Sequence, residues 1–243
     1  MKRRDFLGNS AALGIVVAAA TVPGMMGGSF MIADDKSIKG APANRLTPPA
    51  TGAIPVAFAI SEGVTVIDFC GPWEVFQDVV RPNGNGSAFD LYTVSERTEP
   101  LLGSAGLKLV PDYTFESAPA PKVVVIPAQS GSTALHAWLR KVTPTTDVTM
   151  SVCTGAFQLA KAGLLSGKSA TTHHEFLDRL EKNYPDITVK RGLRFVEGEK
   201  ISTAGGLTSG IDLALRVVER YFGREVATTT AFYMEYQSKG WIL

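Results

Sequence analysis

The predicted strand at 122–126 (KVVVI), which Pro127 ends, constrains the fold most, because its residues after Lys122 form an unbroken apolar run. A run without alternation of apolar and polar residues is typical of a strand buried on both faces. The next predicted strand, 148–152, leads directly into a predicted helix at 154–162. Strands buried on both faces need a layer of helices on each side of the sheet, so the pattern predicts an α/β protein.

Strands and helices alternate along the rest of the chain. The other predicted strands are 55–60, 89–94, 169–172, 187–189, 193–196 and 200–203. The other predicted helices are 64–80, with Pro72 near its first turn, 133–141, 175–183, 207–222 and 225–237. This alternation favours a parallel sheet, in which ligands bind beyond the carboxyl ends of the strands.

The first residues have the pattern of an export signal. Arg3 and Arg4 precede Phe6 and Leu7, as in a twin-arginine signal, and an Ala-rich apolar run follows at 11–22. The pattern predicts a signal segment at 1–24, a flexible Gly/Pro-rich linker at 25–52 and a domain at 53–243. We therefore expect an exported, periplasmic protein without stable membrane association once the signal is removed. The alternatives are a cytosolic protein with a basic tail and an uncleaved anchor.

Charge and cysteine content exclude several classes of function. The chain carries 24 basic and 23 acidic residues, and this balance gives no reason to expect nucleic-acid binding. Its two cysteines and three histidines lack the spacing of a zinc site, and two cysteines do not make a disulfide scaffold. We expect no metal and no other cofactor.

Cys153 is the candidate reactive residue. It lies between a predicted strand and a predicted helix, in the sequence SVCTGA at 151–156. A tight strand-to-helix turn exposes its central side chain next to the first free N–H groups of the helix, which lower a thiol pKa and can also bind an oxyanion. Gly155 allows the close backbone approach that such a turn needs. The alternative is a buried, inert cysteine.

Four segments together resemble the ThiJ/PfpI superfamily, which has a class I glutamine amidotransferase-like fold. They are DFCGPWEVF at 68–76, CTGA at 153–156, SATTH at 169–173 and STAGG at 202–206. The first two are most similar to the isonitrile hydratase branch, which also supplies the sensor halves of some AraC-type regulators. The resemblance runs from residue 55 to 237 and implies a flavodoxin-like three-layer α/β/α sandwich with a mostly parallel sheet and a cysteine nucleophile elbow.

The resemblance also implies roles for particular residues. Cys153 matches the nucleophile, Asp68 the acidic residue that reaches it, and His173 a histidine near it. The alternative for Asp68 is a carboxylate that complements a helix N-terminus, and the alternative for His173 is a cap of the following helix.

The predicted oxyanion and substrate-binding residues are Thr154, Gln129, Ala128 and Gly71. Relatives carry a Gly-Gly pair where this chain has Ala128 and Gln129. This departure changes the expected loop backbone, because Ala and Gln resist positive φ.

The resemblance implies a cysteine-dependent enzyme that hydrates or hydrolyses a small electrophile, with isonitrile hydration to an N-substituted formamide as the leading reaction. The alternatives are glyoxalase or deglycase chemistry on methylglyoxal, and a ligand-binding or redox-sensing protein without turnover. Protease branches place a histidine after the cysteine, where this chain has Thr154. The resemblance implies a homodimer. Cys70 is either a resolving thiol or a small core side chain.

Overall fold

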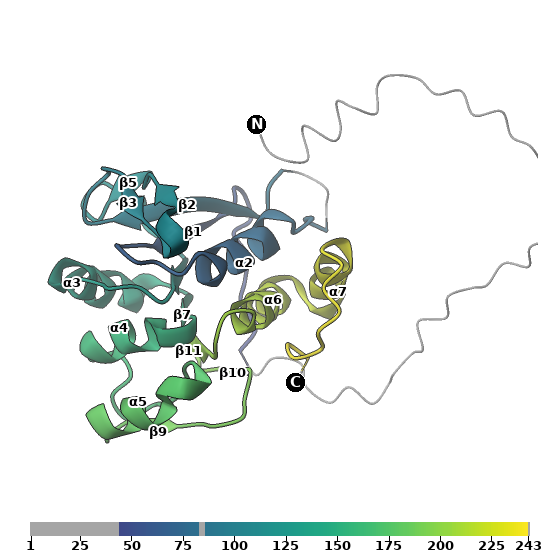
Figure 1. Cartoon of the computed structure of the whole chain (residues 1–243). Helices are drawn as coiled ribbons and strands as arrows, with labels where there is room; N and C mark the ends of the chain where they lie inside the picture. Colours follow the sequence, from purple (N-terminus) through teal and green to yellow (C-terminus); the bar gives the residue numbers. More distant parts are fainter. Residues whose placement is uncertain (1–43, 83–85, 243) are drawn as a thin grey trace, which may run out of the picture. The chain divides into compact units, whose positions relative to one another are not determined.

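The structure is a computed structural model that describes residues 44–82 and 86–242. Within these residues a seven-stranded sheet has the order β10-β11-β7-β6-β1-β2-β5 (Figure 1). β10 and β11 pair antiparallel, and the remaining neighbours are parallel. The strands of this sheet are β1 (Ile54–Ala59), β2 (Phe89–Ser95), β5 (Tyr113–Thr114), β6 (Val123–Ile126), β7 (Val148–Ser151), β10 (Phe195–Val196) and β11 (Ile201–Ala204).

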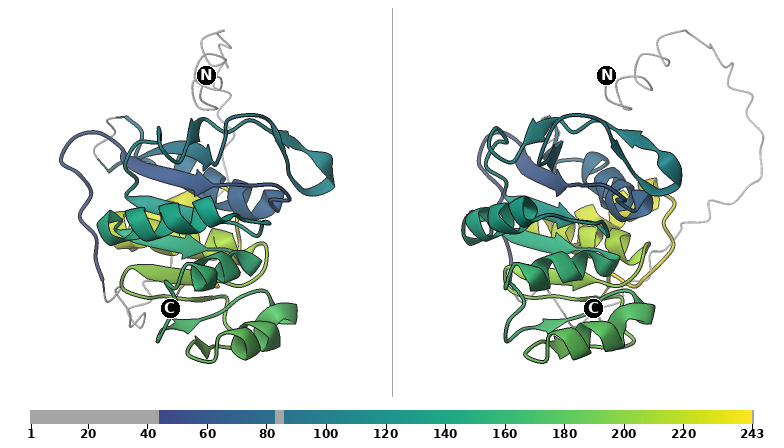
Figure 2. Two further views of the ribbon diagram at one scale, coloured as in Figure 1. Left: turned by 90° about the vertical axis from the view of Figure 1, so that its left-hand side faces the viewer. Right: turned by 60° about the vertical axis from the view of Figure 1, so that its left-hand side comes forward.

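Helices cover both faces of the sheet (Figures 1 and 2). One layer holds α3 (Thr133–Val142), α4 (Ala156–Lys161) and α5 (Leu177–Asn183), and the other α2 (Val66–Gln77), α6 (Ser209–Phe222) and α7 (Arg224–Tyr233). Two buried apolar clusters match these layers, because alternate residues of β1 face opposite sides: Val56 and Phe58 join one cluster, Ala57 and Ala59 the other. The predicted three-layer α/β/α sandwich is confirmed.

Several predicted element boundaries differ from the structure. The region 101–114 carries a small hairpin, β3 (Leu101–Leu102) with β4 (Lys108–Leu109), and the edge strand β5; sequence analysis missed all three. Strands of two residues are too short to show periodicity. Pro72 lies well inside α2, which begins at Val66, rather than in its first turn.

Two predicted elements divide into smaller ones. The segment after Cys153 begins as a 3₁₀ turn, η3 (Cys153–Gly155), before α4 starts. The predicted helix at 175–183 divides into η4 (His174–Phe176) and α5. The predicted strand at 169–172 is reduced to β8 (Ser169–Ala170), which pairs with β9 (Thr188–Val189) outside the main sheet.

The predicted signal segment, 1–24, and most of the predicted linker, 25–52, lie outside the described residues. The described end of that linker, residues 44–52, contacts the predicted domain. The Leu46 N–H donates to the Arg220 carbonyl over 2.8 Å, and Arg220 Nε donates to the Asn44 carbonyl over 2.9 Å. Leu46 also packs against the core. The folded domain therefore includes these residues.

Among the described residues, no helix has both the length and the apolar character needed to cross a bilayer.

Replacing the buried Arg220 by Met tests how residues 44–46 are attached to α6. The Arg220 side chain is 1% exposed, and it also donates to the Glu199 carbonyl (2.7 Å) and lies 3.7 Å from Glu197. Removing one member of a buried ion pair strands the other, so Arg220→Met is expected to lower the free energy of unfolding by about 3 kcal/mol. Urea denaturation measures this change. The control variant Arg191→Met, at a surface residue, is expected to keep the urea midpoint of the wild-type chain. An equal loss of unfolding free energy in both variants would contradict the interpretation.

Candidate active site

Cys153 occupies a strained turn directly after β7. Its φ is 56°, in the left-handed region that non-glycine residues rarely adopt. Hydrogen bonds on both sides hold this conformation: the Cys153 N–H donates to the Gly205 carbonyl (2.8 Å), and the Thr172 hydroxyl donates to the Cys153 carbonyl (2.8 Å). The residue is 7% exposed. The predicted nucleophile elbow is therefore present, with its backbone fixed by two loops distant in the sequence.

Gly155 is the residue that allows the turn to lie so close to the sheet. A Cβ at this position would collide with the Ile126 backbone carbonyl at the end of β6. Only glycine fits such an approach, as sequence analysis predicted.

Two backbone N–H groups donate to the Cys153 sulfur. One comes from Thr154, as predicted, and the other from Leu207. Sequence analysis missed Leu207, which follows Gly205 and Gly206 at the end of β11 and has a φ of 50°. The available signal was the Gly-Gly pair of the STAGG segment, which marks a turn at the carboxyl end of a strand.

Asp68 from α2 lies beside the thiol and is fully buried. Its Oδ2 accepts the Ala128 N–H over 3.1 Å. No hydrogen-bond partner reaches its Oδ1 from residues 44–82 or 86–242. Burial raises the pKa of Asp68 to about 6, against the lowering effect of the Ala128 and Cys153 interactions. The carboxyl thus keeps one oxygen available for proton transfer and titrates closer to neutrality than an exposed aspartate.

The pKa of the Cys153 thiol is raised, whereas the sequence predicted a lowered value. Burial, and secondly the negative charge of Asp68, raise the pKa of Cys153 to about 11, and the N–H groups of Thr154 and Leu207 oppose the rise. The sequence reveals the N–H donors but not the depth of burial, which is why the predicted direction was wrong. With a pKa of about 11 for the thiol and about 6 for the carboxyl, the sulfur keeps its proton at neutral pH and Asp68 is the group able to accept it.

Other predicted binding residues have structural roles. The Ala128 N–H is used by Asp68, so it is not free to bind an oxyanion. Gln129 is tied to the sheet by its Nε2, which donates to the Ala59 carbonyl (2.8 Å). Gly71 is buried in α2, where a Cβ would lie 2.9 Å from Ile211 of α6, so it serves helix packing. Cys70, a free, half-buried thiol, packs against the core cluster that includes Cys153.

His173 caps a helix and lines a cavity. Its Nδ1 accepts the Glu175 N–H over 3.3 Å, which is the capping alternative considered above. Its ring lies against Gly206, where a Cβ would collide with it. No hydrogen bond joins His173 to Cys153 in the described part of the chain, so the imidazole is a neighbour of the site rather than a partner of the thiol.

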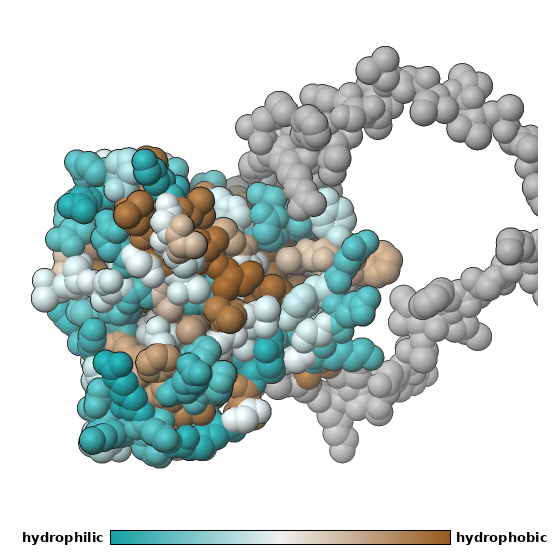
Figure 3. All heavy atoms as spheres, in the orientation of Figure 1, coloured by the Kyte–Doolittle hydropathy of each residue, from teal (hydrophilic) through white to brown (hydrophobic). Residues whose placement is uncertain are grey.

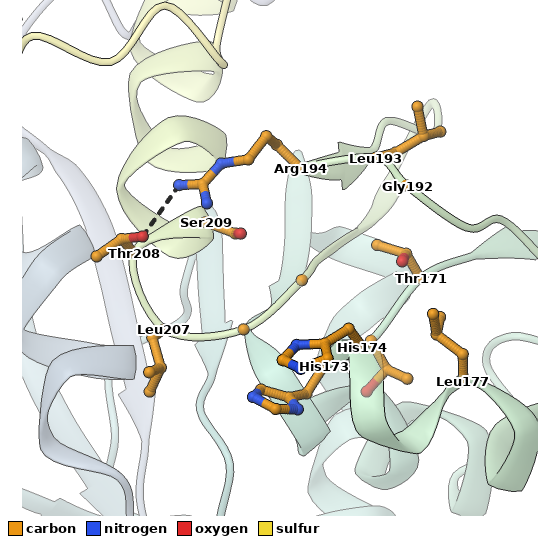
Figure 4. Close-up of a pocket in the computed structure, with 13 residues that line it drawn as sticks. Thr171, His173, His174, Leu177, Gly192, Leu193, Arg194, Leu207, Thr208 and Ser209 are labelled. Atoms are coloured by element: carbon orange, nitrogen blue, oxygen red, sulfur yellow. Dashed lines mark hydrogen bonds between the residues drawn. The ribbon is translucent and has the colours of Figure 1, made fainter.

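The cavity next to His173 has a volume of about 370 Å³ (Figure 4). Leu207 and Thr172, which both make hydrogen bonds to Cys153, line this cavity. Its one arginine, Arg194, donates to buried Asp212 (Nε to Oδ2, 2.6 Å) and to Thr208 (3.1 Å). The cavity therefore offers polar but electrically balanced surroundings on one side of the thiol.

No three His, Cys, Asp or Glu side chains among the described residues gather closely enough to hold a metal ion.

Comparison with known proteins supports the resemblance on which the predicted residues rest. The model of the DJ-1/PfpI family matches residues 55–220. The isonitrile hydratase of Pseudomonas putida is 32% identical over 190 residues, which cover 76% of this chain and 79% of that protein. The HTH-type transcriptional regulator CdhR of Pseudomonas aeruginosa is 29% identical over 175 residues, 70% of this chain. The chain spans about half of that regulator's length, 51%.

Among solved structures, a ThiJ/PfpI family protein from Pseudomonas syringae superposes with a TM-score of 0.67 at 27% identity and covers 77% of each chain.

The raised pKa of the Cys153 thiol predicts how its alkylation depends on pH. In a Cys70→Ser background, the rate of iodoacetamide labelling is expected to rise throughout pH 7–10, because the thiol pKa lies near 11. Asp68→Asn removes the negative charge that raises this pKa, so the profile is expected to move to lower pH. Each pKa unit then gives about tenfold faster labelling at neutral pH. A wild-type plateau below pH 8.5, or a profile unchanged by Asp68→Asn, would contradict this account.

Proposed function

The chain belongs to the DJ-1/PfpI family, and from this premise we propose that it is a cofactor-independent cysteine hydratase that converts isonitriles into N-substituted formamides. The observation that carries the proposal is the unpartnered Oδ1 of buried Asp68 beside the Cys153 thiol, within the residues described. Isonitrile hydration needs a nucleophile and a proton carrier at one carbon atom, and these two side chains supply both. The 32% identity to the isonitrile hydratase of Pseudomonas putida supports the same reaction.

The first step forms a covalent intermediate. The thiol proton passes to Asp68 as the sulfur bonds to the terminal carbon of the isonitrile, and Asp68 delivers that proton to the same carbon. The product is a thioimidate, in which carbon carries one hydrogen, sulfur and the doubly bonded nitrogen. The raised Asp68 pKa of about 6 suits a group that must accept and release a proton near neutrality.

The second step uses water. Asp68 accepts a proton from water as the oxygen adds to the thioimidate carbon, and then passes that proton to the nitrogen. Collapse of this adduct breaks the carbon–sulfur bond, and the proton of the new hydroxyl returns to the sulfur. One isonitrile and one water thus give one formamide, and the thiol and carboxylate are restored. The Thr154 and Leu207 N–H groups stabilise the sulfur anion when it leaves.

A ligand-binding protein without turnover is the second candidate. The thiol pKa of about 11 favours it, because the resting cysteine is protonated and weakly nucleophilic. The match to a transcriptional regulator supports it as well. Export by the segment 1–24 stays a prediction.

Turnover of cyclohexyl isocyanide distinguishes these candidates. With Cys153 reduced, the wild-type chain is expected to form N-cyclohexylformamide, Cys153→Ser to be inactive, and Asp68→Asn to lose about 10²- to 10⁴-fold in kcat. Product formation is followed by chromatography, with Cys70→Ser as the control that keeps activity. Unchanged isocyanide in the presence of reduced Cys153 would refute the hydratase proposal, and turnover of methylglyoxal instead would indicate glyoxalase chemistry.

We also propose that the protein is a homodimer. Exposed apolar side chains gather around the start of α2 and the β3–β4 hairpin (Figure 3): Ile67, Leu102 and Leu107. The bridge between Val64 and Gly103 joins these two segments into one surface. Apolar patches of this kind commonly mark an interface.

Light scattering after gel filtration tests the dimer. The wild-type chain is expected to have twice the monomer mass, and a Leu102→Glu, Leu107→Glu double variant to be monomeric, because four charges would be buried across a two-fold interface. Phe232→Glu, at an 84% exposed position on α7, is the matched control and is expected to remain dimeric. A monomeric wild type, or dissociation only by Phe232→Glu, would contradict this assignment.

A further inference from the structure

A second cavity, of about 250 Å³, lies between α4, α5 and the loop that follows β6. These helices lie in the same layer (Figure 1). Thr154 and Gln129 both line this cavity. The Thr154 N–H donates to the Cys153 sulfur, and Gln129 directly follows Ala128, whose N–H donates to Asp68. Neither Cys153 nor Asp68 lines the cavity, but Thr154 both contacts the sulfur and lines the cavity, so a substituent that extends past Thr154 would enter it.

Aromatic rings form the walls of this cavity. Phe157 lies edge-on to Phe176 and Tyr184, with ring centroids 6.5 and 6.4 Å apart. A cavity of about 150 Å³ lined by apolar side chains holds a benzene molecule, so this one has room for a ring and a small polar group. The walls therefore favour a flat, apolar body.

The rim carries two cations, Lys161 and Arg179. The Arg179 guanidinium carbon lies 5.6 Å from the centroid of the Phe157 ring, and this stacking holds the group over the cavity. The neighbouring acids of α5, Asp178 and Glu181, pair with Arg191 instead. Among the described residues, none that lines this cavity is a carboxylate.

The two cavities therefore differ in charge. In the cavity next to His173, buried Asp212 balances Arg194. In the cavity between α4 and α5, the two cations are left for a ligand. Because, among the described residues, only the cavity between α4 and α5 has cations without a carboxylate beside them, it is the better site for an anionic group.

We propose that the cavity between α4 and α5 binds an aromatic carboxylate, and that this carboxylate is the substituent on the isonitrile nitrogen of the substrate. The substrate class is then an aromatic isocyano carboxylic acid, and the product an N-formylamino acid of the same skeleton. The carboxylate lies between Lys161 and Arg179, and the ring lies against Phe157. The substrate assignment rests on the proposed hydratase function, whereas binding of the carboxylate itself does not.

Binding of benzoate and benzamide tests the cavity without any turnover. Both have the same ring and nearly the same size, but only benzoate is charged. Isothermal titration of the reduced full chain is expected to show saturable benzoate binding, with benzamide at least about tenfold weaker. Lys161→Gln with Arg179→Gln is expected to weaken benzoate about tenfold and to leave benzamide unchanged.

The matched control is Lys168→Gln with Lys190→Gln, which removes the same net charge at two exposed positions outside the cavity. It is expected to keep benzoate affinity. Equal affinity for benzoate and benzamide, or an equal loss in both double variants, would overturn the proposal.

Turnover separates the two proposals. With 4-isocyanobenzoate and phenyl isocyanide as substrates, kcat/KM is expected to favour the carboxylate about tenfold, and the Lys161→Gln, Arg179→Gln variant to lose this preference while still hydrating phenyl isocyanide. Equal turnover of both substrates by the wild-type chain would refute the carboxylate pocket and keep the hydratase. If neither is hydrated but benzoate binds with the expected pattern, the carboxylate site stands and the hydratase proposal fails.

Discussion

The candidate site depends on the left-handed backbone at Cys153. The Gly205 carbonyl and the Thr172 hydroxyl hold this conformation from two separate loops, and Gly155 lets the turn lie against β6. A strained residue persists only where its surroundings determine its conformation, and here three segments of the chain do so. The same arrangement brings the N–H groups of Thr154 and Leu207 to the sulfur, so the strain and the anion-stabilising groups have one structural origin.

Burial sets the chemistry of the thiol and the carboxyl together. It disfavours the charged form of each group, and the proton therefore stays on the sulfur at neutral pH instead of leaving a permanent thiolate. A permanent thiolate would react with many oxidants and electrophiles. A thiol that loses its proton to Asp68 only as a substrate carbon arrives is a more selective nucleophile, and this selectivity is consistent with the proposed hydration.

The sequence predicted the fold and the position of the elbow because both leave strong patterns. The Val/Ile run of β6 and the Cys-Thr-Gly-Ala turn are local signals, and Asp68 came from the family resemblance. The charge state of Cys153 could not be predicted, since it depends on burial by residues far along the chain. The second N–H donor was missed although Gly205 and Gly206 mark a turn just before it, because a leucine gives no local sign of the left-handed conformation that Leu207 adopts. Ala128 was predicted to bind an oxyanion, but its N–H is bonded to Asp68, a pairing across 60 positions.

The attachment of residues 44–46 to α6 acts through the main chain. Arg220 binds the carbonyl of Asn44, and its own carbonyl receives the N–H of Leu46. Peptide groups are the same for almost every amino acid, so substitutions at Asn44 leave this bond intact. A deletion between Leu46 and β1 would pull this carbonyl away from Arg220, whose remaining partners are the Glu199 carbonyl and the Glu197 carboxylate. The side chain at residue 44 is thus free to change, whereas the number of residues between this segment and β1 is not.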